Sequence, residues 1–297
     1  MVEVEVPDAL MVSLRQHGGA AGRAFIAALP GRTVRFLDSW GLRLDGAPMH
    51  GMCALVLPVR REDGTPAVLK LQALDEETAG EAEALLAWGG DGAARLLDHD
   101  RETGTLLLER LDFRRHLSAV PETREAVGIL AGLLARLTER PAPQGLRRLG
   151  DIAAGLLAET PAAVRGPADG DERRLLLDCA AAVREVAGEP GDRLLHWDLH
   201  YGNILAAERE PWLAIDPKPL AGDPGFELLP ALTNRYDPAE TLWRFDLLTE
   251  RLGLDRARAG AWTLGRILQG SLWGLAEGDE KLDEEWAEIA RALLGRG

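Results

Sequence analysis

Two short apolar runs in the second half of the chain follow a polar loop, and their spacing predicts a β-hairpin. The loop occupies residues 196–203, and an apolar run at 204–205 follows it directly. The charged segment 208–211 predicts a turn, and a second apolar run at 212–215 predicts the returning strand. This pattern brings the polar loop and the end of the second strand to the same end of the hairpin.

The first third of the chain predicts helices followed by an antiparallel sheet. Helical periodicity runs from residue 7 to residue 40, and glycine and proline predict breaks in it at Gly18-Gly19 and Pro30-Gly31. One helix is expected at 76–88, among the strands. The strands are expected at 42–44, 53–59, 67–71, 94–97 and 105–111.

From Asp112 onward the pattern predicts that the sheet gives way to helices. The expected helices are 122–140, 152–159, 172–187 and most of 241–294. The last segment carries four tryptophans, most of them expected in the core: Trp243, Trp262, Trp273 and Trp286. The sequence therefore predicts an α+β protein with two domains, 1–111 and 112–297.

The predicted loop and hairpin carry two carboxylates and one carboxamide, from Asp198, Asp216 and Asn203. Phosphoryl transfer needs this set, because one carboxylate orients the attacking hydroxyl and takes its proton while oxygen ligands hold Mg²⁺. The spacing H-x-D-x-x-x-x-N from His196 onward, followed by an apolar strand that ends in Asp, is the catalytic-loop arrangement of kinases. Asp198 is therefore the expected catalytic residue, and Asn203 and Asp216 are expected to bind Mg²⁺.

Two other interpretations of the loop remain open. His196, Asp198 and His200 alternate along the chain and would share one face of a strand, where a zinc hydrolase would ligate its metal. The segment Tyr201-Gly202 breaks such a strand, and no further His or Cys lies nearby. A polar turn without chemistry would leave the kinase spacing unexplained. The kinase interpretation is preferred, with His196 structural and no role assigned to His200.

A lysine in an apolar strand is the second candidate site. The chain contains three lysines and 31 arginines, and Lys70 lies within the predicted strand 67–71. A compact ammonium is the group that kinases place on the α and β phosphates of ATP, and a carboxylate from the next helix holds it there. Glu81 lies on the inward face of that helix and is the expected partner, with Glu77 as the reserve.

Two further segments are assigned to the nucleotide by position alone. The turn 46–51 lies where kinases cover the phosphates with a glycine-rich loop, but it lacks the G-x-G-x-x-G pattern. A backbone contact at Gly51 is therefore a hypothesis beside the alternative of a plain hairpin. In a kinase-like layout, residues 109–111 form the hinge that pairs with adenine, which makes Glu109 and Leu111 candidates.

Composition restricts the class of protein. The 297 residues are 46% hydrophobic and 28% charged, which is typical of a globular protein with a sizeable core. The net charge of −14 argues against a nucleic-acid partner and suits a small cationic substrate. The acidic residues 1–5, the lack of a bilayer-length apolar run and two isolated cysteines, Cys53 and Cys179, predict a cytoplasmic protein without membrane contact.

These motifs resemble those of the aminoglycoside phosphotransferases, most closely the streptomycin 6-kinase branch. The resemblance implies a protein-kinase-like, two-lobed fold with an antiparallel-sheet N-lobe and a helical C-lobe. It also implies that ATP and Mg²⁺ are used to phosphorylate a hydroxyl of streptomycin, the 6-hydroxyl of its streptidine ring, and so confer resistance. The segments that carry the resemblance are 196–205, 215–217 and 222–228, and it extends through 6–8, 88–92 and 262–264.

The acceptor pocket has no short motif. Glu227, Asp237 and Glu277 are the candidates for contact with a cationic substrate, and Asp223 is expected to cap a helix. Lys218 stands where protein kinases have glycine after Asp-Phe, and a phosphate contact and a surface position are equally open for it. A monomer is expected. A kinase acting on an amino sugar or hydroxyurea, and a catalytically silent nucleotide-binding protein, remain the alternatives.

Overall fold

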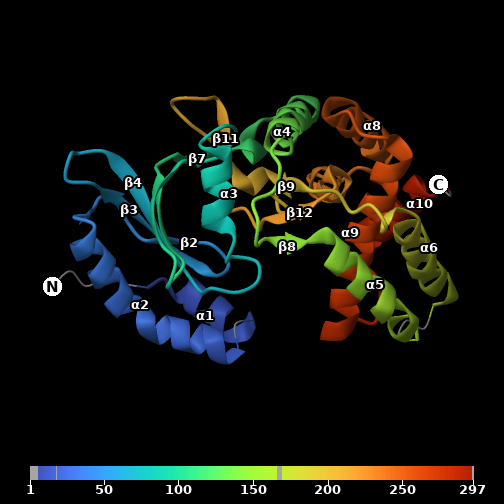
Figure 1. Cartoon of the computed structure of the whole chain (residues 1–297), viewed down its shortest axis with the longest axis horizontal. Helices are drawn as coiled ribbons and strands as arrows, with labels where there is room; N and C mark the ends of the chain where they lie inside the picture. Colours follow the sequence, from blue (N-terminus) through green and yellow to red (C-terminus); the bar gives the residue numbers. More distant parts are fainter. Residues whose placement is uncertain (1–5, 18, 166–168, 296–297) are drawn as a thin grey trace. The chain divides into compact units, whose positions relative to one another are not determined.

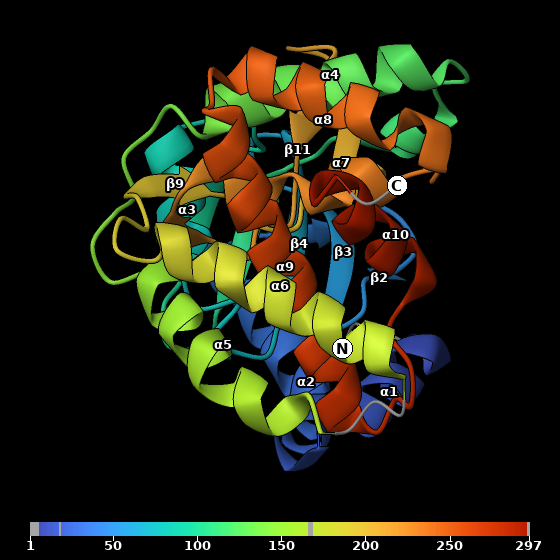
Figure 2. The ribbon, with the colours of Figure 1, turned by 90° about the vertical axis from the view of Figure 1, so that its right-hand side faces the viewer.

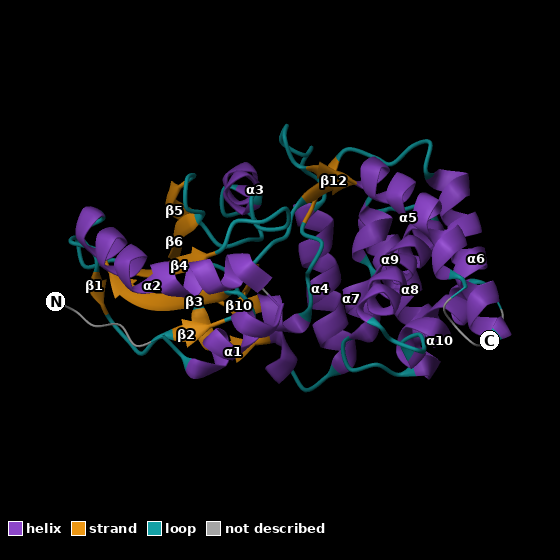
Figure 3. Ribbon diagram, turned by 90° about the horizontal axis from the view of Figure 1, so that it is seen from below, coloured by secondary structure: helices purple, strands orange, loops and turns teal. Residues whose placement is uncertain are grey.

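The structure is a computed structural model that describes residues 6–17, 19–165 and 169–295. The chain separates into two units, Met1–Asp112 and Phe113–Gly297. Figure 3 shows that most of the helices belong to the second unit. The acidic residues 1–5 and the expected break at Gly18 lie outside the described residues.

The first unit is built on an antiparallel sheet with strand order β1-β3-β4-β6-β5, and β2 pairs with β3. The segment 46–51 was expected to be a single turn, and that expectation is wrong. Met49 and His50 form β2, because their backbones pair with Val56 and Leu55 of the next strand. The strands are β1 (Arg43–Leu44), β2 (Met49–His50), β3 (Ala54–Arg60), β4 (Pro66–Gln72), β5 (Leu96–Asp100) and β6 (Thr105–Glu109).

Two helices, α1 (Asp8–His17) and α2 (Gly19–Ser39), pack against this sheet (Figure 1). The expected break at Pro30-Gly31 is wrong, since α2 continues through Pro30. A proline inside a helix loses one backbone hydrogen bond. Burial on both sides of the proline offsets this loss, because Leu29 and Phe36 are 0% and 2% exposed in the core of the unit.

The third helix of this unit, α3 (Glu81–Trp88), begins five residues later than predicted. The carboxylate of Asp75 causes the delay, because its Oδ1 accepts hydrogen bonds from the backbone amides of Glu77 and Thr78, both at 2.9 Å. This folds the chain before α3 into a turn. Glu77, the reserve partner of Lys70, therefore lies in that turn and not on the helix.

The two cysteines occupy different environments. Cys53 is exposed in the turn between β2 and β3, where the Gly51 amide donates to the Ala54 carbonyl at 3.0 Å. Cys179 lies in the second unit and is 1% exposed.

Six short strands form two small sheets in the second unit. One has the order β11-β10-β7 and the other β8-β12-β9. The predicted hairpin is confirmed, because Ile204 pairs antiparallel with Ala214. The expectation that helices follow directly from Asp112 is wrong, since residues 112–116 form β7, which pairs with the edge of β10. The strands are β7 (Asp112–His116), β8 (Arg147–Arg148), β9 (Arg193–Leu195), β10 (Ile204–Ala206), β11 (Trp212–Ala214) and β12 (Leu220–Gly222).

Helices make up most of the second unit, and α5 and α6 lie along the long helix α9 (Figure 2). The α-helices are α4 (Thr123–Leu137), α5 (Leu149–Ala163), α6 (Gly170–Val186), α7 (Leu229–Thr233), α8 (Thr241–Leu252), α9 (Arg256–Glu277) and α10 (Glu284–Leu293). The 3₁₀ turns are η1 (Leu117–Ala119), η2 (Tyr201–Asn203), η3 (Pro224–Glu227) and η4 (Pro238–Glu240). Across the described parts of the chain, no helix combines the length and apolar character needed to cross a membrane.

The expectation that most of the C-terminal tryptophans are core residues is wrong. Trp262 is fully buried, but Trp273 is 45% exposed, and Trp243 and Trp286 are half-buried. Trp262 lies on the face of α9 that packs inside the unit, whereas Trp273 lies three turns further along the same helix. The Trp273 ring packs edge-on against Trp197 of the loop described below.

Candidate active site

A buried ion pair joins the sheet of the first unit to α3. Lys70 on β4 is 5% exposed, and Glu81, the first residue of α3, is 1% exposed. The Lys70 Nζ lies 2.7 Å from both carboxylate oxygens of Glu81, and Gln72 Nε2 donates to Glu81 Oε2 at 2.7 Å. Lys70 and Gln72 are two residues apart on one strand and so share a face. The expected pair of Lys70 with Glu81 is present.

The other nucleotide candidates of the first unit lie in ordinary backbone environments. Gly51 is exposed beside Cys53. Glu109 is engaged with Arg95 twice, because its amide donates to the Arg95 carbonyl at 3.0 Å and its carboxylate accepts from the Arg95 amide at 2.8 Å. Leu111 is half-buried. Their assignment to a phosphate cover and a hinge stays a prediction.

In the second unit, His196 organises the polar loop from inside. Its ring is fully buried, Nε2 donates to the Ile215 carbonyl at 2.9 Å, and Nδ1 accepts from the Asp198 amide at 3.4 Å. Burial lowers the pKa of His196 to about 4, against the opposing effect of the Asp198 carboxylate. The neutral ring therefore ties the loop to the second strand of the hairpin, and both of its nitrogens are engaged.

This arrangement does not support the zinc interpretation. His200 is also used within the loop, where its Nδ1 accepts from the Gly202 amide at 3.0 Å and caps η2. Within the described ranges, no group of three or more His, Cys, Asp or Glu side chains is placed to hold a metal ion.

Glu227 also supports the loop, through the loop's backbone. Its side chain is fully buried, and both carboxylate oxygens accept from the Trp197 amide, at 3.0 and 2.9 Å. Burial raises the pKa of Glu227 to about 7, although hydrogen bonds from the Trp197 and His196 amides oppose the shift. In η3, Glu227 therefore binds the backbone of the loop, and its contact with a substrate stays a prediction.

Two residues of the site have left-handed backbone conformations that non-glycine residues rarely adopt. Trp197 has a φ of 66° and Asp216 a φ of 58°. The Trp197 ring packs edge-on against Trp273, with ring centres 6.0 Å apart, and the guanidinium groups of Arg147 and Arg266 each lie 4.5 Å from its centre. These contacts hold Trp197 in place and so fix the direction in which the next residue, Asp198, projects.

Asn203 and Asp216 lie at neighbouring positions of the hairpin. The Ile215 amide donates to the Asn203 carbonyl at 2.9 Å, which places Asp216 next to that pair. Asn203 Nδ2 donates to the Asp198 carbonyl at 2.9 Å, so that Asn203 Oδ1 is turned away from this bond. Mg²⁺ prefers oxygen ligands, and a carboxamide oxygen beside a carboxylate fits that preference.

The side chain of Lys218 lies against the candidate base. Its Nζ is 3.4 Å from Asp198 Oδ2, and the two side chains are 34% and 27% exposed. The Lys218 amide also donates to the His196 carbonyl at 3.0 Å. The sequence left the role of Lys218 open between phosphate and surface, and no pattern in it predicted this contact.

Two further contacts complete the frame of the loop. His116 on β7 forms a hydrogen bond through Nδ1 with the Gly202 carbonyl at 3.0 Å, which no sequence pattern indicated. Asp223 caps η3 by accepting from the Gly225 amide at 2.8 Å, as predicted, and its other oxygen pairs with Arg258 Nε at 2.6 Å.

The two remaining acidic candidates are exposed. Asp237 caps η4 by accepting from the Ala239 amide at 2.9 Å, and Glu277 is the last residue of α9. Contact of Asp237 or Glu277 with a substrate stays a prediction.

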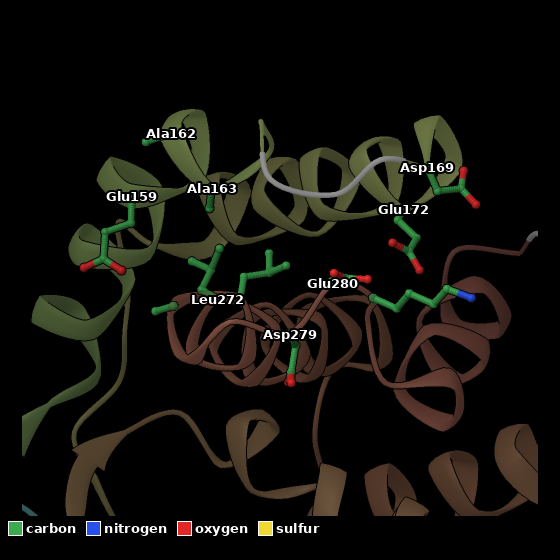
Figure 4. Close-up of a pocket in the computed structure, with 11 residues that line it drawn as sticks. Glu159, Ala162, Ala163, Asp169, Glu172, Leu272, Asp279 and Glu280 are labelled. Carbon is green, nitrogen blue, oxygen red and sulfur yellow. The ribbon is translucent and has the colours of Figure 1, made fainter.

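A pocket of about 930 Å³ lies among α5, α6 and the end of α9. In Figure 4, Glu172 and Glu280 point toward one another across it, and Leu272 lies at its floor. Five acids and one base line it, which suits a cationic ligand. No motif marks this pocket, because its charged residues come from distant segments: Glu159, Asp169, Glu172, Asp279, Glu280 and Lys281.

Comparison with known proteins gives consistent matches. The family model of the aminoglycoside/hydroxyurea antibiotic resistance kinases matches residues 39–278. A hydroxyurea phosphotransferase of Kitasatospora aureofaciens is 63% identical over 99% of this chain and 87% of its own length. A streptomycin 6-kinase of Streptomyces glaucescens is 56% identical over 98% of each chain.

A solved structure of similar fold is that of a thermostable mutant of the aminoglycoside phosphotransferase APH(4)-Ia in complex with ADP and hygromycin B. The TM-score is 0.58 at 15% identity, and the match covers 89% of this chain and 98% of the other. A likeness at this identity shows the fold alone. The predicted protein-kinase-like fold, with an antiparallel-sheet N-lobe and a helical C-lobe, is confirmed.

Proposed function

The chain belongs to the aminoglycoside/hydroxyurea antibiotic resistance kinases, and we propose that it transfers the γ-phosphoryl group of ATP to a hydroxyl of streptomycin. The acceptor is the 6-hydroxyl of the streptidine ring, and its phosphorylation inactivates the antibiotic. The catalytic loop carries this proposal, because Asp198 and Asn203 stand in kinase spacing in a chain that is 56% identical to a streptomycin 6-kinase. ATP as the donor places the reaction in the cytoplasm.

Asp198 is the base in this proposal. Its carboxylate is 27% exposed, so a hydroxyl can reach it, while the Asn203 amide and the His196 ring hold its main chain. Asp198 accepts a hydrogen bond from the acceptor hydroxyl, orients its oxygen toward the γ-phosphorus and takes its proton.

Separate residues bind the nucleotide. Lys70, held by Glu81, contacts the α and β phosphates as a point charge. Asn203 Oδ1 and the Asp216 carboxylate would hold Mg²⁺, which neutralises phosphate charge when it is bound. The left-handed backbone of Asp216 directs its carboxylate for this purpose.

Hydroxyurea is the second candidate acceptor, favoured by the 63% identity to a hydroxyurea phosphotransferase. It offers a hydroxyl to the same base, so the same loop serves both reactions. The net charge of −14 favours streptomycin, because that drug carries two guanidinium groups and hydroxyurea is neutral.

The test is ADP release by the purified protein with Mg-ATP and streptomycin, with hydroxyurea, or with neither, followed by mass spectrometry of the acceptor. A streptomycin-dependent rate and a product heavier by one phosphate are expected. Stimulation by hydroxyurea alone would replace the first acceptor by the second. Mg-ATP binding without turnover of either compound would contradict both.

A further inference from the structure

We propose that Lys218 contacts the phosphoryl group during its transfer and is a catalytic residue. The proposal rests on the phosphotransferase function given above. It assigns to Lys218 a hydrogen bond from Nζ to a non-bridging oxygen of the γ-phosphoryl group, made while the ammonium stays beside Asp198.

The backbone of Lys218 is hydrogen-bonded to the start of the catalytic loop. Its amide donates to the His196 carbonyl at 3.0 Å, and its carbonyl accepts from Arg147 Nη2 at 3.3 Å. Two residues later, Leu220 of β12 pairs with Leu195 of β9. Lys218 is therefore held in register with the loop, and its side chain is directed at Asp198 by this backbone.

The reaction creates a charge conflict at Asp198 that Lys218 resolves. Transfer brings the negatively charged γ-phosphoryl group to a hydroxyl that is bound to the carboxylate of Asp198, and like charges at this distance repel. The Lys218 ammonium lies 3.4 Å from Asp198 Oδ2. A cation beside the base lowers the cost of bringing the anionic phosphoryl group to it.

The contact with Asp198 leaves Lys218 able to bind a ligand. Its distance of 3.4 Å is longer than the 2.7 Å between Lys70 and Glu81, and Lys218 keeps 34% of its side chain exposed. An ammonium has three donors in a compact group, so one ammonium can serve a carboxylate and a phosphoryl oxygen together.

The residue type is itself informative, because the chain uses lysine at three positions and arginine at 31. Lys70 is buried in the ion pair of the first unit, and Lys281 lines the acidic pocket. An arginine at position 218 would bind the Asp198 carboxylate through two parallel hydrogen bonds. A lysine supplies the positive charge without this bidentate contact, and the carboxylate stays able to accept a proton.

The transfer forms one bond to phosphorus and breaks another. The acceptor oxygen forms a bond to the γ-phosphorus, while the bond from that phosphorus to the β–γ bridging oxygen breaks and ADP departs with the electron pair. The hydroxyl proton passes to Asp198. Lys218 remains an ammonium throughout and changes only its hydrogen bonds.

The experiment compares Lys218→Met with wild type and with Arg256→Met. The control removes an exposed ion pair of the same unit, in which Arg256 Nε lies 2.7 Å from Asp246 Oδ1. Two quantities are measured: kcat and the KM for ATP, and the affinities for Mg-ADP with and without aluminium fluoride by calorimetry. Fluoroaluminate mimics the phosphoryl group in transfer and needs no acceptor.

The expected result is a fall in kcat of about 10²-fold, with a KM for ATP within about threefold of wild type. The gain in affinity that fluoroaluminate gives to Mg-ADP is expected to disappear, and the affinity for Mg-ADP alone to remain. A kcat within about threefold of the Arg256→Met control overturns the proposal. Equal losses of affinity with and without fluoroaluminate overturn it as well.

Folding and the identity of the acceptor are controlled separately. Half-exposed ion pairs contribute little to stability, so the melting temperatures of the variants are expected to match. Should Lys218→Met fail to fold, Lys218→Gln is measured and judged by the same criteria. If wild type turns over neither streptomycin nor hydroxyurea, the proposed function fails, but the fluoroaluminate comparison still decides on Lys218. A wild type that does not bind Mg-ADP overturns both.

Discussion

The side-chain amide of Asn203 donates to the main-chain carbonyl of Asp198 at 2.9 Å. This bond links the candidate base to a candidate metal ligand across five residues of the loop. Because the amide nitrogen is used in this way, the carbonyl oxygen of Asn203 is the atom left for a cation. The spacing of the kinase motif therefore has a structural cause, since Asn203 both closes the loop and presents an oxygen.

Asp198→Asn is expected to lower kcat by about 10²- to 10⁴-fold, the usual contribution of a general base. Mg-ATP affinity is expected to stay close to wild type, because the isosteric amide preserves the loop. Initial rates measure kcat, and calorimetry measures the affinity for Mg-ATP. Asp246→Asn, at an exposed ion pair, is the matched control. Unchanged turnover in Asp198→Asn would remove the base from the mechanism.

Asp216→Asn is expected to abolish the Mg²⁺-dependent part of ATP binding. Asparagine adopts the left-handed conformation readily, so the φ of 58° is kept while the charge is lost. ATP affinity is measured with Mg²⁺ and with EDTA, and the two values are expected to converge in the variant. A difference as large as that of wild type would show that Asp216 is not a ligand.

Lys70→Met is expected to lower the free energy of unfolding by about 3–5 kcal/mol, because it leaves the carboxylate of Glu81 buried without its cation. The double variant Lys70→Met with Glu81→Leu is expected to regain most of that stability and still bind ATP poorly. Denaturant titration and nucleotide calorimetry separate the two effects. If the double variant binds ATP as wild type does, the pair has a structural role only.

His196 is expected to make stability depend on pH between about 6.5 and 4. Its folded pKa, about 4, lies below its unfolded value of 6.5, so its contribution is complete above pH 6.5 and is lost as the pH falls toward 4. The loss amounts to about 3 kcal/mol. Unfolding of His196→Gln, measured across this range, is expected to lack this contribution. If the free energies of unfolding of variant and wild type changed with pH in parallel, His196 would not be the source of the pH dependence.

Glu227 is expected to make stability depend on pH in the direction opposite to His196. Its folded pKa, about 7, lies above its unfolded value of 4.5, so its contribution is complete below pH 4.5 and is lost as the pH rises through 7. Glu227→Gln keeps an acceptor for the Trp197 amide and is expected to gain about 3 kcal/mol relative to wild type between pH 4.5 and 7. A constant difference over that range would show that Glu227 does not titrate there.

The sequence predicted the parts of the site that depend on short-range pattern. The hairpin after Asn203 follows from two apolar runs and a turn, and the Lys70–Glu81 pair joins residues only 11 apart. The contact of Glu227 with the Trp197 amide could not be predicted, because the two residues are 30 apart in the sequence and become neighbours only through packing. The contact of His116 could not be predicted for the same reason, because its partner Gly202 is 86 residues away in the sequence.

Helix boundaries were predicted wrongly where one side chain or one buried face outweighs the local sequence pattern. A proline predicts a helix break, but buried neighbours carried α2 through Pro30. Helical periodicity suggested that α3 begins at residue 76, but the Asp75 carboxylate holds the next residues in a turn. Neither competing interaction is visible in hydrophobic periodicity.

The different environments of the two cysteines make a site-specific fluorescent probe possible without engineering. A maleimide dye reaches the exposed thiol of Cys53, whereas Cys179 is shielded at 1% exposure. The dye would sit in the turn between β2 and β3, beside the segment assigned by position to the nucleotide phosphates. Its emission would report in real time whether ATP closes that turn, with the natural sequence serving as its own sensor.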